Sequence, residues 1–333
     1  MIKQNTAFVV FLGFILLLNS CKSNEKLSHI TVVNYNVENL FDTEKDKLIN
    51  DEEFLPESEK QWTKERYKKK LDDIARVLTS IDDEDLPEII GLAEVENRRV
   101  LEDLIKTKAM SRGHYAIVHQ DSPDERGIDV ALLYRPAEFK MLSFDVIPIT
   151  GSRTRDILHV SGKFGNESFH FFVNHWPSRN AGLEKSEPAR MKVAEALKNK
   201  VKQVLGQDPI ANIVIMGDMN DTPENKSLKN ILGAGMPGSK SDLVNLMMPL
   251  ARDGKGTYCY RGRWDMLDNL VVSKSLLDAK GFRVNPVTGY IFSADWMNYT
   301  DNKGNVVPNR TYGGPNYYGG VSDHYPIYFE LIK

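Results

Sequence analysis

The sequence predicts one α/β domain built on mixed β-sheets. Apolar runs of strand length, such as 213–216, alternate with longer segments whose apolar residues recur at helical spacing. Between residues 115 and 175, strand-like runs follow one another with no room for helices, which favours antiparallel pairing there. The chain has 333 residues, of which 41% are hydrophobic, and this is enough for one large core.

The N-terminal segment has the features of a bacterial lipoprotein signal. Lys3 precedes an apolar run over residues 7–18 that is too short to span a bilayer as a stable helix. Leu18-Asn-Ser-Cys21 resembles a site of cleavage before an acylated cysteine, and the alternative is an ordinary secretory signal with an incidental cysteine. The predicted organisation is a signal peptide at 1–20, a polar tether at 21–28 with the lipid on Cys21, and one domain at 29–333.

This organisation predicts an exported protein of the cell envelope that a lipid holds on a bacterial membrane. Cys259 then has no partner cysteine, so no internal disulfide is expected. The formal charge of −3 at pH 7 argues against a dedicated nucleic-acid-binding module, because such a module usually has a basic surface. No feature of the sequence indicates a protein partner.

Local patterns predict each element of the chain in order. Strands follow from β-branched and alternating runs, and helices from capping residues placed before an amphipathic stretch. The first part contains a strand at 29–37, a surface loop at 42–61, a helix capped by Thr63, a strand at 88–93 and a helix from Asn97 to about Met110. Strands follow at 115–119, 130–134, 141–149, 157–164 and 168–175, then a helix opened by Ser186 and Pro188 and stopped by Gly206, and later strands at 265–272 and 325–332.

The segment at 212–223 is the most informative stretch. Its apolar run predicts a strand buried on both faces, and Asp218 and Asn220 would project together from its end if the backbone stayed extended. Thr222 and Pro223 are expected to cap and open the next helix, so neither Asp218 nor Asn220 is needed as a cap. In open α/β sheets, ligands bind at such strand ends.

Other predicted strands also end in polar side chains. These residues are Asn36, Glu94, Asp129, His175, Asp218 with Asn220, Asp268, and Asp323 with His324. Carboxylates and amides without cysteine suit a hard cation such as Mg²⁺, with Mn²⁺ as the alternative. Cleavage of a phosphate ester needs such a cation and a group that takes a proton from water.

Each of these residues taken alone also has an ordinary structural explanation. Glu94 fits a surface acid, His175 a hydrogen-bonded core histidine, Asp268 a buried partner of an arginine, and Asp323 a turn before the last strand. The long segment at 296–320 is likewise open to two interpretations. Its tyrosines either stack on a substrate ring or pack the loop against the body of the domain.

Seven motifs in one order resemble the endonuclease/exonuclease/phosphatase superfamily, whose fold is deoxyribonuclease-I-like. Gly-Asp-Met-Asn at 217–220 and Ser-Asp-His at 322–324 are the most specific of them. The motifs are Asn34–Asp42, Gly91–Asn97, Gly127–Pro136, Val173–Arg179, Met216–Asp221, Leu267–Ser273 and Ser322–Pro326. The resemblance runs from about residue 30 to the C-terminus and implies a four-layer α/β sandwich of two packed mixed sheets flanked by helices.

The resemblance also implies a role for each matching residue. It implies that Glu94, Asn36 and Asp323 bind the metal, and that Asp218 and Asn220 orient the attacking water and the phosphate. It implies that His175 and His324 contact the phosphate or transfer a proton, and that Asp268 orients His324. Asp129 is assigned as a partner of His175. Arg179 is a candidate for holding a substrate phosphate, because a guanidinium suits bidentate contact.

The predicted function is Mg²⁺-dependent hydrolysis of a phosphoester, most closely nuclease-like cleavage of a phosphodiester. The first alternative is a phosphatase or phospholipase-type esterase acting on lipid or sugar phosphates, and one fold hosts both activities. The alternative from another class is a noncatalytic surface-binding lipoprotein. The expected partners are therefore a phosphoester, either nucleic acid or a phosphorylated small molecule or lipid, and a membrane.

Overall fold

A computed structural model describes residues 29–82, 85–278 and 280–333. The predicted signal peptide, the tether and Cys21 lie outside the described residues. None of the helices within those ranges combines the length and the apolar character that a bilayer span requires. Cys259 is a free cysteine and lies in the β11–β12 hairpin (Tyr258–Tyr260 and Arg263–Asp265).

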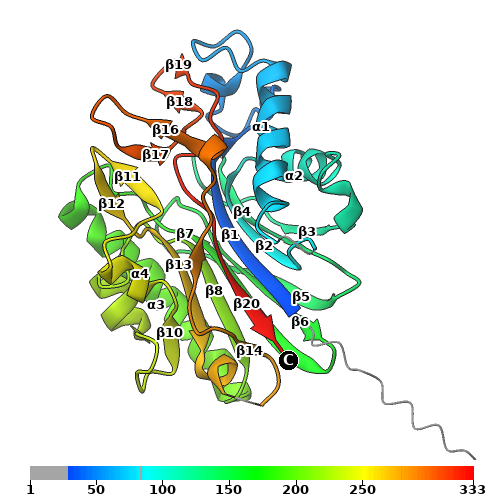
Figure 1. Ribbon diagram of the computed structural model, residues 1–333, viewed down its shortest axis with the longest axis vertical. Coiled ribbons are helices and arrows are strands. Elements are labelled where there is room, and N and C mark those ends of the chain that lie inside the picture. Colours follow the sequence, from blue (N-terminus) through cyan, green and yellow to red (C-terminus); the bar gives the residue numbers. More distant parts are fainter. Residues whose placement is uncertain (1–28, 83–84, 279) are drawn as a thin grey trace, which may run out of the picture.

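Two mixed sheets form the centre of the domain, and the predicted four-layer α/β architecture is confirmed (Figure 1). In the described part of the chain, the first sheet has the order β14-β20-β1-β2-β4-β3, with β15 added on β20. Its strands are β1 (His29–Leu40), β2 (Ile89–Val95), β3 (Ala116–His119), β4 (Asp129–Tyr134), β14 (Arg283–Val284), β15 (Tyr290–Ile291) and β20 (Ile327–Ile332).

The second sheet has the order β5-β6-β7-β8-β13-β10-β9. Its strands are β5 (Phe139–Ile147), β6 (Ile157–Phe164), β7 (Glu167–His175), β8 (Asn212–Asp218), β9 (Ala234–Gly235), β10 (Leu243–Asn245) and β13 (Asp268–Ser273). β5, β6 and β7 pair antiparallel, as the closely spaced strands predict, whereas β7 and β8 run parallel because α3 (Leu183–Gln207) connects them.

Three apolar layers hold the sheets and helices together. Val32 on β1 packs in the core between the sheets, and the next residue, Val33, packs under α1 (Lys64–Leu78) and α2 (Arg98–Ile105), as the period of two in a strand requires. α3 covers the outer face of the second sheet. Burying one large side chain such as Phe171 contributes about 1.5–3 kcal/mol, so each of these layers adds substantially to stability.

The predicted caps are confirmed in the first two helices. The Thr63 side chain accepts a hydrogen bond from the Arg66 amide, and the Asn97 side chain accepts one from Val100 at 3.1 Å. α2 ends at Ile105, earlier than predicted, and a turn bonded through Thr107 follows.

The prediction that Thr222 and Pro223 open a helix is wrong. Asn225 Oδ1 accepts hydrogen bonds from both the amide and the hydroxyl of Thr222, and these bonds close a turn instead. A π-helix follows at Ser227–Leu232 and ends, as predicted, at Gly233 with φ of 80°. α3 also differs, since it begins before Ser186 and continues through Gly206.

The segment at 296–320 is not an open loop but folds into two short hairpins. These are β16–β17 (Asn298–Thr300 and Val306–Pro308) and β18–β19 (Tyr312–Gly313 and Asn316–Tyr317). Tyr312 packs against Trp62, whereas Tyr299 and Tyr318 are exposed. The hairpins gather with β11–β12 and the blue N-terminal loop at one end of the sandwich, opposite the C-terminus (Figure 1). A short helix, α4 (Met248–Arg252), and 3₁₀ turns at Glu52–Phe54, Ser111–Gly113, Lys274–Leu277 and Asp295–Met297 complete the described elements.

Candidate active site

One row of the second sheet supplies three of the predicted residues. His175 pairs in register with Asp218, and Asp218 pairs with Asp268 on the next strand. Gly217 makes the close approach of β7 and β8 possible, since its φ is 149° and a Cβ atom there would lie 2.0 Å from the Asn174 carbonyl oxygen. The register of β7, β8 and β13 therefore brings the three side chains together.

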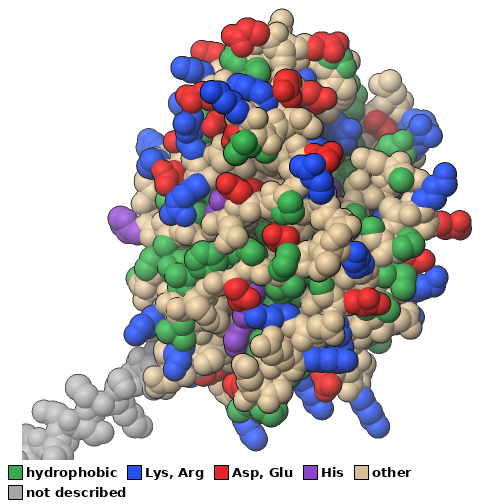
Figure 2. All heavy atoms as spheres, turned by 180° about the vertical axis from the view of Figure 1, so that it is seen from behind, with side chains coloured by type: hydrophobic (Ala, Val, Ile, Leu, Met, Phe, Trp, Pro, Cys, Tyr) green, Lys and Arg blue, Asp and Glu red, His purple; other side chains and the backbone are tan. Residues whose placement is uncertain are grey.

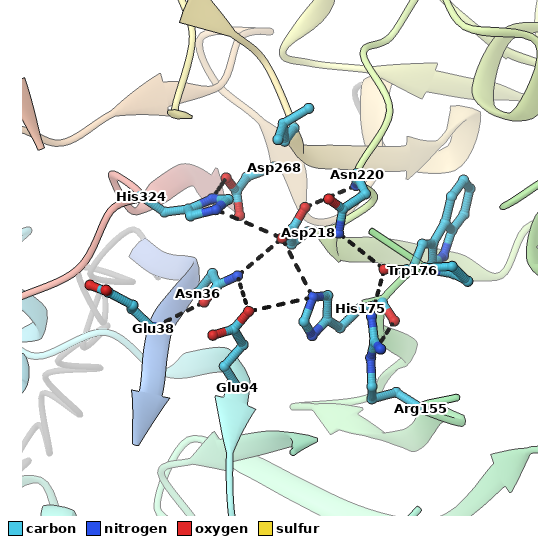
Figure 3. Close-up of polar contacts among 12 residues, drawn as sticks. Asn36, Glu38, Glu94, Arg155, His175, Trp176, Asp218, Asn220, Asp268 and His324 are labelled. Atoms are coloured by element: carbon cyan, nitrogen blue, oxygen red, sulfur yellow. Dashed lines mark hydrogen bonds and ion pairs between the residues drawn. The ribbon is translucent and has the colours of Figure 1, made fainter. Parts of the chain in front are cut away.

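The first sheet supplies Asn36 and Glu94 from the ends of β1 and β2. A β-bulge falls at Glu94, whose φ is 66°, and it re-aims the carboxylate into the site (Figure 3). Asn36 Nδ2 donates to Asp218 Oδ2 at 3.0 Å and lies 3.4 Å from Glu94 Oε1. Asn36 Oδ1 accepts from the Glu38 amide at 3.0 Å, which orients the side chain so that its amide nitrogen links the two carboxylates.

Hydrogen bonds hold both the backbone and the ring of His324. Ser322 Oγ donates to the Asn36 carbonyl and accepts from the His324 amide, which fixes the Ser-Asp-His turn on β1. His324 Nδ1 donates to Asp268 Oδ2 at 2.7 Å, and Nε2 lies 3.9 Å from Asp218 Oδ2. Burial alone would lower the pKa of His324, but Asp268 and Asp218 raise this pKa well above its usual value, so the ring is cationic near neutral pH.

Asp218 is the hub of the site (Figure 3). Its Oδ1 accepts from the Asn220 amide at 2.9 Å, while Oδ2 faces Asn36, His175 and His324. Burial, with a smaller contribution from Asp268, raises the pKa of Asp218 to about 7 against the opposing charge of His324. Asn220 does reach Asp218, but through a left-handed turn with φ of 48° and not through an extended strand.

His175 has a different environment from His324. Its Nε2 lies 3.6 Å from Asp218 Oδ2 and 3.8 Å from Glu94 Oε1. The chain leaving it is clamped by the buried Arg155, which donates to the carbonyl oxygens of His175 and Trp176 at 3.2 and 2.6 Å. Burial lowers the pKa of His175 well below its usual value, and the charge of Arg155 lowers it further, so this ring is neutral.

Two predicted residues have partners other than those expected. The pairing of Asp129 with His175 is not found, because strand alternation places Asp129 on the helix-covered face of the first sheet, with Ala131. Asp129 instead contacts His119 and accepts from the Ser122 amide. Arg179 lines the cleft, but its Nε donates to the Asn220 carbonyl at 2.6 Å and a terminal nitrogen lies 3.3 Å from Asp265, so it braces the turn after Asp218.

Three residues at the site were not identified from the sequence. Glu38 lines the cleft, and burial together with Asp323 raises its pKa to about 7. Glu38 falls within the motif Asn34–Asp42, so its position two residues after Asn36 could have identified it as a site residue. Arg310, 2.6 Å from Asp323, and the buried Arg155 lie in segments whose local pattern carries no such signal.

The site opens into a cleft of about 1050 Å³. Its walls come from the 52–60 segment, the turn at 178–183 and the hairpin region at 258–265 and 310–315. Each of the five Lys and Arg side chains that line it has a carboxylate oxygen within 3.7 Å. The pairs are Lys60 with Glu53, Arg126 with Asp124, Arg179 and Arg263 with Asp265, and Arg310 with Asp323.

The donor atoms at the centre of the cleft fit a divalent cation. Glu94, Glu38, Asp218 and Asp323 line the cleft, and one oxygen of Asp218, one of buried Asp268 and a nitrogen of His324 lie within 4.8 Å of one another. Because the His324 ring is cationic, the available ligand atoms are the carboxylate oxygens. The side chains are mostly carboxylates and no cysteine is among them, which is the donor set of a hard cation. Asp323 raises the pKa of Glu38 and Asp268 raises that of Asp218, so a bound divalent ion would offset repulsion between these carboxylates.

The sandwich fold and this carboxylate and histidine cluster define a metal-dependent phosphoester hydrolase. The family model for the endonuclease/exonuclease/phosphatase family matches residues 31–333, and the chain belongs to that family. Among curated protein sequences, none matches this chain.

Solved structures that are similar to this chain share its fold at low sequence identity. TDP2 from D. rerio, complexed with single-strand DNA product, has a TM-score of 0.57 and 15% identity over 91% of this chain and 99% of its own. A mannosyl-6-phosphatase from Bacteroides thetaiotaomicron has a TM-score of 0.55 and 16% identity over 91% and 100%. The human Nocturnin catalytic domain with bound sulfate has a TM-score of 0.56 and 14% identity over 92% and 98%.

Proposed function

We propose that this hydrolase acts on a compact phosphate ester, such as a sugar phosphate or a lipid headgroup, and not on a long nucleic acid. The observation that carries the proposal is the pairing of every cation in the cleft with a carboxylate. A polyanion binds through uncommitted Lys and Arg side chains along its path. Here only the centre of the cleft would attract phosphate strongly, once its metal is bound. The interspersed acidic and basic side chains on the face drawn in Figure 2 also form no continuous basic surface.

We assign the metal to Glu94 and Asp323, with Glu38 as a further carboxylate and Asn36 holding Glu94 and Asp218 in place. Mg²⁺ is the expected ion, with Mn²⁺ as a substitute, because oxygen ligands dominate. When bound, the ion neutralises phosphate charge and lowers the cost of charge on the departing oxygen.

The side chains of this chain supply the remaining chemistry. Asp218, with its raised pKa, takes the proton from the attacking water, and the Asn220 amide holds one of its oxygens in place. Cationic His324, oriented by Asp268, donates a hydrogen bond to a phosphate oxygen. Neutral His175 contributes a weaker, uncharged contact on the other side of Asp218.

The second candidate is nuclease-like cleavage of a phosphodiester. Tyr260 favours it, because this side chain lines the cleft, is 56% exposed and could stack on a base. Arg263, from the same hairpin, gives that side of the cleft a cation.

A substrate panel with Mg²⁺ distinguishes the two candidates. It contains a sugar phosphate, a phosphoinositide, sphingomyelin, single-stranded and plasmid DNA, and RNA, each with a chelator control. The compact-substrate proposal predicts the highest kcat/KM on one of the small esters or headgroups, with little dependence on salt. A preference for DNA or RNA whose rate falls steeply with salt would instead establish the nuclease.

We also propose that the chain is exported and lipid-anchored through Cys21. The motif at 18–21 and the short polar segment after it support this proposal. Replacing Cys21 with Ser should release the protein from the membrane fraction and abolish labelling with a fatty acid analogue. Membrane association of the Cys21→Ser variant equal to that of the wild type would contradict it.

A further inference from the structure

A second group of side chains that could hold a metal ion lies outside the cleft, at the loop end of the β3–β4 hairpin. One nitrogen of His119 and one carboxylate oxygen from each of Asp121 and Asp129 lie within 4.8 Å of one another. Neither Asp129 nor His119 lines the catalytic cleft. His119 is the last residue of β3 and Asp129 the first of β4, so the antiparallel pairing of the two strands brings the groups together.

The His119 ring is buried and has an unsatisfied nitrogen. Its side chain is 3% exposed, and Nε2 has no hydrogen-bond partner although it lies 3.3 Å from Asp129 Oδ2. If Nε2 of His119 carried a proton directed at Asp129, the resulting hydrogen bond would be shorter and better aligned than this contact. Two atoms that ligate one tetrahedral ion at about 2.0–2.1 Å lie roughly 3.4 Å apart, which is close to the separation found here.

The surroundings orient both groups toward a shared ion. Asp129 Oδ1 accepts from the Ser122 amide at 2.8 Å, which leaves Oδ2 for another partner. Asp121 Oδ1 lies 3.8 Å from His119 Nδ1, and this side chain is 84% exposed, so it can turn toward either the ring or the ion. Ligating histidines are commonly held by such an outer carboxylate. The buried hydroxyl of Ser122 also has no partner.

We propose that His119, Asp129 and Asp121 form a second cation site that takes a transition-metal ion such as Zn²⁺ or Co²⁺. The imidazole ligand separates this site from the oxygen-rich catalytic centre, because imidazole favours transition metals over Mg²⁺. The other coordination positions are filled by water.

The site would anchor the loop at 120–128. Asp124 in this loop accepts from Arg155 Nη1 at 2.9 Å, and Arg155 holds the carbonyl oxygen of His175. Arg126 in the same loop lines the cleft. A cation at the loop end of the hairpin would therefore restrain the loop that carries Asp124 and Arg126.

Zn²⁺ titration in excess Mg²⁺ tests the proposal, with His119→Gln as the variant and His114→Gln as its control. His114 is an exposed histidine on the turn before β3. In wild type and His114→Gln, ¹⁵N spectra of the imidazoles should show one ring, that of His119, shifting with Zn²⁺, and binding should be about 10–100-fold weaker in His119→Gln. Equal Zn²⁺ affinity in the two variants, or a shift confined to His324, would overturn the second site.

Asp121→Asn keeps the proposal testable if His119→Gln fails to fold, because Asp121 is exposed. It should weaken Zn²⁺ binding while the Mg²⁺-dependent rate at saturating substrate is unchanged. Zn²⁺ should also slow amide hydrogen exchange at 124–127 in wild type. Unaltered Zn²⁺ affinity in Asp121→Asn together with unprotected loop amides would refute the site.

Discussion

The two histidines of the active site flank the same carboxylate and yet have opposite electrostatic environments. His324 is bonded to Asp268 at 2.7 Å, and the two nearby carboxylates keep it cationic. His175 is equally buried, but Arg155, Arg126 and His324 all oppose a positive charge on it, and its ring lies no closer than 3.6 Å to Asp218 and 3.8 Å to Glu94. Both rings are buried, which alone would keep each neutral, and only His324 has carboxylates close enough to outweigh that burial.

This difference follows from the elements that carry the two residues. His324 lies in a turn that Ser322 ties to β1, directly opposite Asp268 on β13. His175 ends β7, where its backbone carbonyl accepts from a guanidinium. One charged and one neutral imidazole thus lie beside the same oxygen of Asp218.

The largest expected effect comes from Asp218→Asn, because Asp218 lies between both histidines. Asparagine keeps the shape but cannot take a proton, so kcat should fall about 10²–10⁴-fold with the fold intact. Glu59→Gln, at the exposed rim of the same cleft, is the matched control and should keep the wild-type rate. An Asp218→Asn rate close to that of the control would remove Asp218 from the mechanism.

The second-largest effect compares the contributions of the two histidines to kcat/KM. A hydrogen bond from a charged donor is worth about 1.5–3 kcal/mol, so His324→Gln should lower kcat/KM roughly 10–150-fold. A neutral bond is worth about 0.5–1.5 kcal/mol, so His175→Gln should cost roughly 2–12-fold. A larger loss for His175→Gln would reverse the assignment of the charged donor.

Asp268→Asn should change the pH dependence more than the maximal rate. Removing the carboxylate lowers the pKa of His324, so activity that needs the cationic ring is lost at a lower pH. The alkaline limb of the kcat/KM profile should therefore move to lower pH. An unmoved alkaline limb would mean that another group sets it.

The smallest effect is on stability, and the two histidines should give opposite slopes with pH. The raised pKa of His324 stabilises the folded state below about pH 6.5, and this stabilisation is lost as pH rises through the folded-state pKa. The depressed pKa of His175 costs stability as pH falls below about 6.5, because only the unfolded chain then binds the proton.

Urea unfolding of metal-free wild type and the two Gln variants measures these slopes. Relative to wild type, His324→Gln should lose stability most at low pH, and His175→Gln should gain it there. Parallel pH profiles for the two variants would show that the rings share one protonation state.

Much of this architecture is predictable from local sequence. The caps at Thr63 and Asn97 rest on hydrogen bonds to an amide three residues away, and the stop at Gly233 rests on a bond to the Leu228 carbonyl five residues back. The helix predicted to begin at Thr222 is absent because the Asn225 side chain accepts hydrogen bonds from Thr222, and a Thr-Pro pattern alone does not reveal this competing acceptor.

The sequence by itself determined which residue types end the strands, and hence the chemistry of the site and the class of enzyme. Only the tertiary structure decided which of them meet. Asp268 reaches His324 and Asp129 does not reach His175, because apolar packing sets the register and facing of distant strands. Arg155 enters the site from the connection before β6 for the same reason. Alternation and capping act over a few residues, whereas the charge beside each histidine depends on contacts between residues far apart in the chain.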